Sequence, residues 1–247
     1  GQTIVKEKTL MVFDEVQLCE RALTSLKYFC ENAPDYHIIV AGSLLGVAVN
    51  RAKFSFPVGK VDMKTLYPMD MEEFMLALGE DDLVKQIKKC FQTDTPLPSA
   101  LHDAAMQLYR QYLVVGGMPE CVMQFAGTKD YILVRHTQDT ILASYLNDMS
   151  KYNNLNEIKK TRLAYDNITV QLSKKNTRFQ YKLIKKGGRA SEFENAIEWL
   201  CLSGIVSQVY KVEQIKKPLE NYRDIDAFKI YVSDLGLPVS YTHLRAH

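Results

Sequence analysis

Two adjacent acidic residues, Asp14 and Glu15, follow directly on the apolar run Leu10–Phe13. A short, continuous apolar run predicts a strand buried in a parallel sheet. Ligands of open α/β sheets bind beyond the carboxyl ends of the strands, which is where these two acids are expected. A carboxylate in that position can hold Mg²⁺ through its waters, and a second can orient a water for hydrolysis. The alternative is that the pair only caps the helix that follows.

A strand–helix–strand unit is predicted to position this pair. Residues 9–13 form the first strand, residues 20–32 carry apolar side chains at helical spacing, and residues 37–41 form a second buried strand closed by Gly42 and Ser43. This order is typical of a parallel α/β sheet. The hydroxyl of Ser43 follows the second strand as the acids follow the first, although capping the next helix is a common role for serine.

The rest of the first 150 residues is predicted to be mainly helical after one more strand at 58–66. Asp70 is the expected N-cap of a helix that runs through Leu78, and Pro119 is expected to open a helix at its first turn. Further helices are predicted over residues 81–91, 100–114 and 130–149.

The C-terminal third is predicted to contain a helix, a loop, a second helix over 192–202 and two strands, 205–210 and 228–232, that pair as a hairpin. Helices followed by a two-stranded wing are the outline of a winged helix. The predicted fold class is therefore α/β, with a partial parallel-sheet core, a helical lid and a winged-helix-like α+β domain. The expected domain bounds are 1–70, 71–152 and 153–236, with a tail over 237–247.

Positive charge is concentrated in one segment of a chain whose net charge is only +2. Residues 151–189 hold 11 Lys or Arg against 2 Asp or Glu. On a winged helix such residues could contact DNA phosphates, and on a protein-binding module they would face a partner or solvent. The candidate nucleic-acid contacts are Lys174, Lys175, Arg178, Lys182, Lys185, Lys186 and Arg189.

Composition narrows the class of protein further. Hydrophobic residues make up 47% of the 247-residue chain, which is enough for a buried core, and no apolar stretch is long enough to span a membrane. The five cysteines are widely spaced and form no zinc-binding pattern. We therefore expect a cytoplasmic protein without a membrane partner.

An ordered series of short motifs resembles a family of prokaryotic AAA+-like P-loop ATPases whose C-terminal domain has no assigned function. The motifs extend over about residues 4–236, and they are Val40–Gly46, Phe54–Val61, Leu66–Asp70, Gly116–Glu120, Asp148–Tyr152, Arg178–Lys182 and Phe228–Tyr231. Each motif alone is weak, whereas the ordered set is specific.

This resemblance implies roles for the candidate site residues, with ATP and Mg²⁺ as cofactors. Asp14 would be the Walker B aspartate that holds Mg²⁺, Glu15 would orient the attacking water, and Ser43 would be a polar sensor. Arg51 and Lys60 are candidates for reaching a phosphate, although ordinary surface charge is the simpler interpretation of both.

The resemblance also predicts that this sequence is a fragment. Family members carry a phosphate loop before the Walker B strand and a further domain after Ser233–Leu237, and the 247 residues contain no G-x-x-x-x-G-K-[ST] loop. Residues 237–247 resemble translated sequencing-adapter DNA, so we expect His243 and His247 to have no role. The expected function is an Mg²⁺-dependent ATPase that couples hydrolysis to a conformational change. The alternative is a DNA- or protein-binding module with a degenerate ATPase half.

Overall fold

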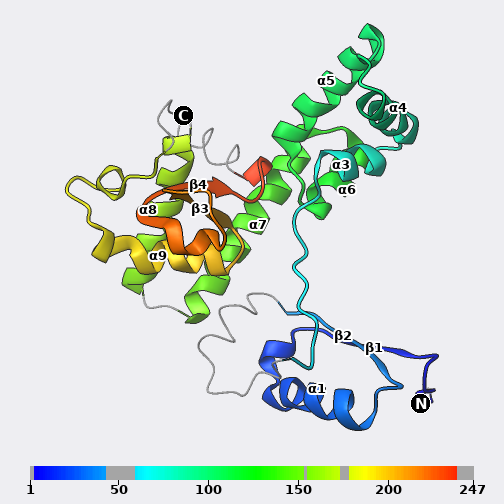
Figure 1. Ribbon diagram of the computed structural model, residues 1–247, viewed down its shortest axis with the longest axis vertical. Helices are drawn as coiled ribbons and strands as arrows, with labels where there is room; N and C mark the ends of the chain where they lie inside the picture. Colours follow the sequence, from blue (N-terminus) through cyan, green and yellow to red (C-terminus); the bar gives the residue numbers. More distant parts are fainter. Residues whose placement is uncertain (1–2, 43–58, 153–154, 173–177, 238–247) are drawn as a thin grey trace. The chain divides into compact units, whose positions relative to one another are not determined.

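The computed structural model describes residues 3–42, 59–152, 155–172 and 178–237. The chain divides into two compact units, residues 1–66 with 198–204 and residues 67–197 with 205–247. Its architecture is mixed α/β, with a small parallel sheet, many helices and an antiparallel hairpin towards the C-terminus (Figure 1). The bounds expected at residues 70, 152 and 236 stay predictions.

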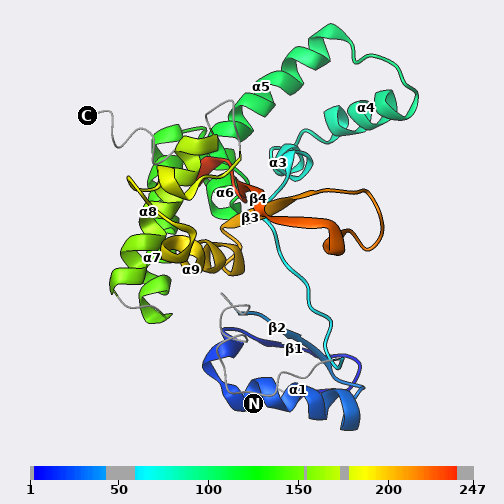
Figure 2. The same ribbon diagram turned by 60° about the vertical axis from the view of Figure 1, so that its left-hand side comes forward.

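The first unit contains the predicted strand–helix–strand arrangement. Strands β1 (Leu10–Phe13) and β2 (His37–Val40) pair in parallel, and helix α1 (Glu20–Asn32) connects them along one face of the sheet (Figure 2). The sheet and helix enclose a small core whose buried members are Val16, Leu23 and Leu26. The positions of both strands and of this helix are confirmed, but the predicted burial of the strands is wrong, since Leu10, Val12 and Ile39 are 53, 60 and 54% exposed.

The strand predicted over residues 58–66 is wrong for its described part, because residues 59–66 form no strand. Val61 packs against the core of the first unit, but Leu66 is 96% exposed. A strand needs a partner for its backbone hydrogen bonds. Among the described residues, β1 and β2 pair only with each other, and the segment joins neither open edge of their sheet, so its backbone has no strand partner.

The second unit begins with helices that position its main core. Helix α3 (Met71–Ala77) starts with a capping box, in which the Asp70 carboxylate accepts from Glu73 N–H and the Glu73 carboxylate accepts from Asp70 N–H. The helices that follow are α4 (Asp81–Gln92), α5 (Ser99–Val115), α6 (Pro119–Thr128) and α7 (Tyr131–Tyr152). Phe74 and Phe125 are stacked in the core, at a ring-centroid distance of 6.2 Å. The predicted N-cap at Asp70 and helix start at Pro119 are both confirmed.

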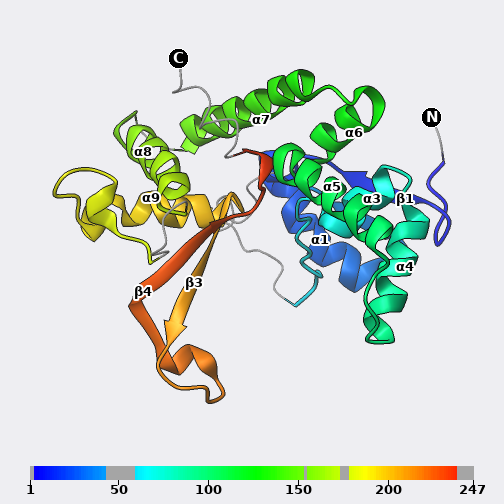
Figure 3. The same ribbon diagram turned by 90° about the horizontal axis from the view of Figure 1, so that it is seen from above.

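The C-terminal part of the chain has the predicted helix, loop, helix and strand pair. Strands β3 (Val206–Val212) and β4 (Arg223–Val232) form an antiparallel hairpin that extends away from the helices (Figure 3). The other elements of this part are α8 (Leu155–Leu172), η2 (Tyr181–Leu183), α9 (Ala190–Leu202) and η3 (Leu219–Tyr222). In the described part of the chain, no helix is both long enough and apolar enough to cross a membrane.

Candidate functional site

The acidic pair lies at the carboxyl edge of the parallel sheet. Phe13 O accepts from Ala41 N–H at 2.8 Å, and Ala41 O accepts from Val16 N–H at 3.0 Å. These bonds hold the chain after β1 against the chain after β2. The side chains of Asp14 and Glu15 are both exposed. The first unit therefore presents two carboxylates at the edge where open α/β sheets bind ligands.

The turn that carries this pair has an unusual backbone. Glu15 lies in the left-handed region, with φ 50° and ψ 41°, and its N–H donates to Asp14 Oδ1 at 2.9 Å. A residue with a Cβ pays roughly 1–2 kcal/mol for this conformation, and such outliers cluster at functional sites. Neither α1 nor the short helix η1 (Val16–Leu18) receives a side-chain hydrogen bond from its N-cap residue. The helix-capping alternative for the pair therefore has no support in this geometry.

The carboxylates at this edge suit Mg²⁺, which keeps several of its waters, better than a metal ion that takes all its ligands from the protein. Within residues 3–42, 59–152, 155–172 and 178–237, no group of three or more His, Cys, Asp or Glu residues could hold a metal ion. Mg²⁺ needs fewer protein ligands, because it keeps several waters and takes its other ligands from one or two carboxylates and from phosphates. The exposed Asp14 carboxylate is compatible with that mode of binding.

Of the other predicted site residues, Lys60 is not brought to the acidic pair. Ser43, like Arg51, lies outside the described residues. Lys60 Nζ forms an ion pair with Glu31 Oε1 at 3.2 Å, and Glu31 lies at the end of α1 that leads into β2. That end of the helix is at the amino edge of the strands, away from Asp14 and Glu15. The position of Lys60 therefore gives no support to a contact with phosphate.

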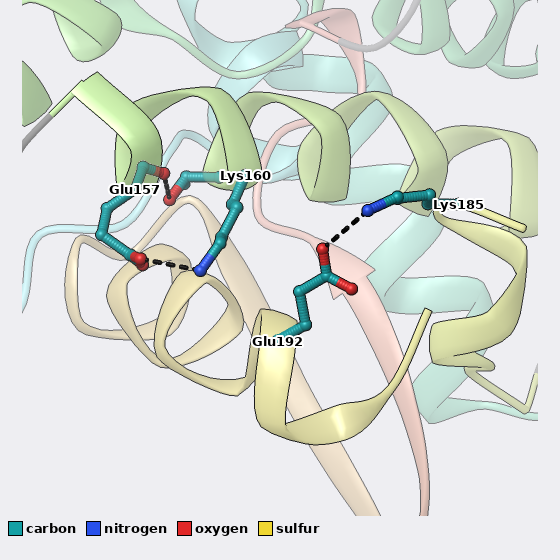
Figure 4. Close-up of polar contacts among 5 residues, drawn as sticks. Glu157, Lys160, Lys185 and Glu192 are labelled. Atoms are coloured by element: carbon teal, nitrogen blue, oxygen red, sulfur yellow. Dashed lines mark hydrogen bonds and ion pairs between the residues drawn. The ribbon is translucent and has the colours of Figure 1, made fainter. Parts of the chain in front are cut away.

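The predicted basic contacts fall on the chain between α8 and α9. Lys174 and Lys175 lie outside the described residues, and the other five side chains are exposed. Two of the five are engaged within the protein: Lys185 pairs with Glu192 at 3.0 Å (Figure 4), and Arg178 donates to Asp226 O at 3.2 Å. The remaining three are Lys182, Lys186 and Arg189.

The sequence motifs gave no role to Asp234, yet its buried carboxylate joins distant parts of the second unit. Asp234 is only 4% exposed, and its Oδ2 accepts from Gly117 N–H at 2.6 Å. Its Oδ1 accepts from Gly236 N–H at 2.9 Å and from Leu237 N–H at 3.0 Å. One side chain thus fastens the end of β4 to the turn between α5 and α6. The sequence offered two signals for this contact, a single acid in the Ser233–Leu237 motif and a Gly-Gly pair in the Gly116–Glu120 motif.

Leu237, the first residue of the expected tail, belongs to this junction. Its side chain is 3% exposed, and its N–H is one of the donors to Asp234. The remaining tail residues, 238–247, lie outside the described part of the chain.

Glycines allow the backbone segments at the junction to approach closely. Gly117 O accepts from Met69 N–H at 2.7 Å, and Met69 O accepts from Tyr112 OH at 2.9 Å. A Cβ at Gly117 would lie 2.0 Å from Met69 O, and one at Gly236 would lie 2.5 Å from Val115 O. Both contacts are with backbone atoms, which cannot rotate away. Only glycine therefore fits these two positions.

Burial of Asp234 should make the stability of the protein depend on pH. Burial raises the pKa of this carboxyl above its usual value, although its backbone N–H donors oppose the rise. The pKa of this carboxyl is therefore higher in the folded protein than in the unfolded chain, where it is about 3.9. The contribution of Asp234 to the free energy of unfolding is complete below pH ~3.9 and is lost as the pH rises through the folded-state pKa. The free energy of unfolding, measured with urea across this range, should therefore fall with pH more steeply for the unmodified protein than for Asp234→Asn. Equal slopes would contradict this assignment.

Comparisons with known proteins agree with the two-part organisation. Residues 106–247 match a family model described as a domain of unknown function (DUF8612), and residues 2–75 match that of an AAA domain. The fold is similar to the solved structure of a Walker-type ATPase of Pyrococcus abyssi, with a TM-score of 0.54 and 12% identity over 94% of this chain. The match covers 63% of that structure's chain. The search of curated proteins found no match. The chain therefore belongs to the DUF8612 family and has an AAA domain at its N-terminus.

Proposed function

We propose that the AAA domain of this protein hydrolyses ATP with Mg²⁺, using Asp14 and Glu15 at the carboxyl edge of the β1–β2 sheet. The observation that carries the proposal is the position of the pair: two exposed carboxylates follow β1, directly beside the end of its parallel neighbour. This is the place of the Walker B acids in an AAA domain, and residues 2–75 match such a domain.

The two acids have different roles in this proposal. Asp14 would hold Mg²⁺ through its waters, and the bound ion would supply positive charge to the phosphates of ATP. Glu15 would accept a hydrogen bond from the attacking water and orient it towards the γ-phosphate. Ser43 stays a candidate for sensing phosphate, and Lys60 stays one for contacting it, although the ion pair of Lys60 with Glu31 does not support that role.

The proposal also requires a phosphate cradle that these 247 residues do not contain. Backbone N–H groups and a lysine of a G-x-x-x-x-G-K-[ST] loop normally bind the phosphates of ATP. We therefore propose that these 247 residues alone bind ATP weakly and that hydrolysis requires a loop of this kind. The energy of hydrolysis would drive a conformational change within the protein or in a partner.

Substitution of Asp14 tests the Mg²⁺ role. In the protein expressed from the complete reading frame, ATP should bind more tightly with Mg²⁺ than with a chelator. Asp14→Asn should reduce the factor by which Mg²⁺ tightens ATP binding by about tenfold or more, because one carboxylate fewer holds the ion. The matched control is Asp35→Asn, an exposed acid of the same unit that pairs with Lys6. An unchanged Mg²⁺ effect in Asp14→Asn would remove the metal role from this residue.

The second candidate is a DNA- or protein-binding module whose AAA half does not hydrolyse ATP. The exposed side chains of Lys182, Lys186 and Arg189 between α8 and α9 favour it. The complete reading frame separates the two candidates. An in-frame phosphate loop favours the ATPase, and a frame without one favours the binding module.

A further inference from the structure

We propose that the turn between α8 and α9 contacts the phosphates of double-stranded DNA through Lys182, Lys186 and Arg189, without reading the base sequence. The three side chains are exposed, and none forms an ion pair with a described residue. We call the segment 181–189 the basic turn. Its role does not depend on the proposed ATPase activity.

The neighbouring basic side chains already interact with other groups of the protein, so Lys182, Lys186 and Arg189 are the ones left to contact phosphates. Lys185 is paired with Glu192, and Lys160 is paired with Glu157 at 2.9 Å (Figure 4). The guanidinium of Arg178 donates to Asp226 O. No acidic residue occurs from Arg178 to Arg189, so within this stretch nothing neutralises the three free charges.

The backbone of the basic turn is held in place by buried groups. Ile184 is 9% exposed, Leu183 O accepts from Asn167 Nδ2 at 2.8 Å, and Lys185 O accepts from Gly188 N–H at 2.8 Å. A Cβ at Gly188 would lie 2.8 Å from Tyr181 O, so the turn packs closely on itself. A backbone fixed in this way carries the three cations within nine residues and loses little entropy when they bind.

The charge on α9 argues against insertion of this helix into a DNA groove. Glu194 and Glu198 are exposed along α9, and Glu192 near its start is bound to Lys185. A groove-reading helix carries its first residues between two rows of phosphates, where these acids would be repelled. Contacts confined to phosphates set position and affinity, but they do not specify bases.

The basic turn also fits a duplex better than a single strand. Proteins that bind single strands usually stack bases on exposed aromatic side chains. Tyr181, the aromatic residue of the turn, packs edge-on against Phe179 and Phe228, at centroid distances of 5.3 and 6.0 Å. Its ring is therefore engaged within the protein.

Salt-dependent binding to a labelled DNA duplex tests this proposal. Each neutralised phosphate adds about 0.9 to the slope of log affinity against log salt, so three contacts weaken binding ~40-fold between about 50 and 200 mM salt. The triple variant Lys182→Gln, Lys186→Gln and Arg189→Gln should lose about 3 from that slope. The matched control removes three exposed hairpin lysines, Lys211, Lys216 and Lys217, and should retain the slope.

Several outcomes would overturn the proposal. Equal losses in the two triple variants would mean that only the total charge matters. A strong preference for one of two unrelated duplexes would contradict the absence of base reading, and preferential binding to single strands would contradict the choice of duplex. Binding to anionic vesicles or an acidic protein without binding to the duplex would assign the turn to another partner. Circular dichroism and thermal unfolding establish that each variant is folded.

Discussion

Replacing Gly117 with alanine is expected to lower the free energy of unfolding by about 3–5 kcal/mol, because overpacking and the loss of a charged hydrogen bond add together. The new Cβ would lie 2.0 Å from Met69 O, so the two backbone segments must move apart. That movement weakens the hydrogen bonds of Gly117 to Met69 and to the Asp234 carboxylate. Urea unfolding measures the loss directly, and the midpoint of thermal unfolding should fall by about 10 °C.

Gly127→Ala is the matched control for this prediction. Gly127 lies in α6, and its added Cβ would meet no atom within 4 Å. Alanine is more favourable than glycine inside a helix by about 1 kcal/mol, so this variant should be as stable as the unmodified protein or more so. If Gly117→Ala behaved like Gly127→Ala, the junction around Asp234 would not be closely packed.

Glu15→Gln is expected to slow ATP hydrolysis by about 100-fold or more, because general-base positioning of water contributes roughly 10²–10⁴ in rate. The amide keeps the size of the side chain but is a poor acceptor for the proton of the attacking water. ATP affinity should change little, since Glu15 is not proposed to hold the phosphates. The measurement is the rate of phosphate release by the protein expressed from the complete reading frame.

The control for Glu15→Gln is Glu20→Gln, which removes the same charge from an exposed position in the first turn of α1. This variant should turn over ATP at the unmodified rate. Equal losses in the two variants would point to a general effect of charge on the first unit. A loss of ATP binding in Glu15→Gln alone would place the residue among the phosphate contacts instead.

Local sequence patterns predicted the elements that carry the acidic pair. The continuous apolar runs before Asp14 and Gly42 predicted the positions of both parallel strands, although they did not predict that one face of each strand is exposed. Asp70 and Glu73 have the spacing of a capping box, and their reciprocal hydrogen bonds confirm the start of α3. In these cases one short segment contained all the groups that determine the structure.

The same patterns did not predict features that depend on distant contacts. Residues 58–66 were predicted to form a strand, but residues 59–66 pair with no described strand. The partners Gly117 and Asp234 are separated by 117 positions, and neither motif indicates that they meet. Likewise, the spacing of Lys185 and Glu192 did not reveal that their ion pair removes one cation from the basic turn.

The most direct measurement is the identity of the nucleotide bound to Glu15→Gln after incubation of the complete protein with ATP and Mg²⁺. We expect this variant to retain ATP, whereas the unmodified protein and Glu20→Gln retain ADP, because only Glu15 orients the attacking water. If Glu15→Gln retained ADP formed at the unmodified rate, the acidic pair at the end of β1 would not be the hydrolytic site.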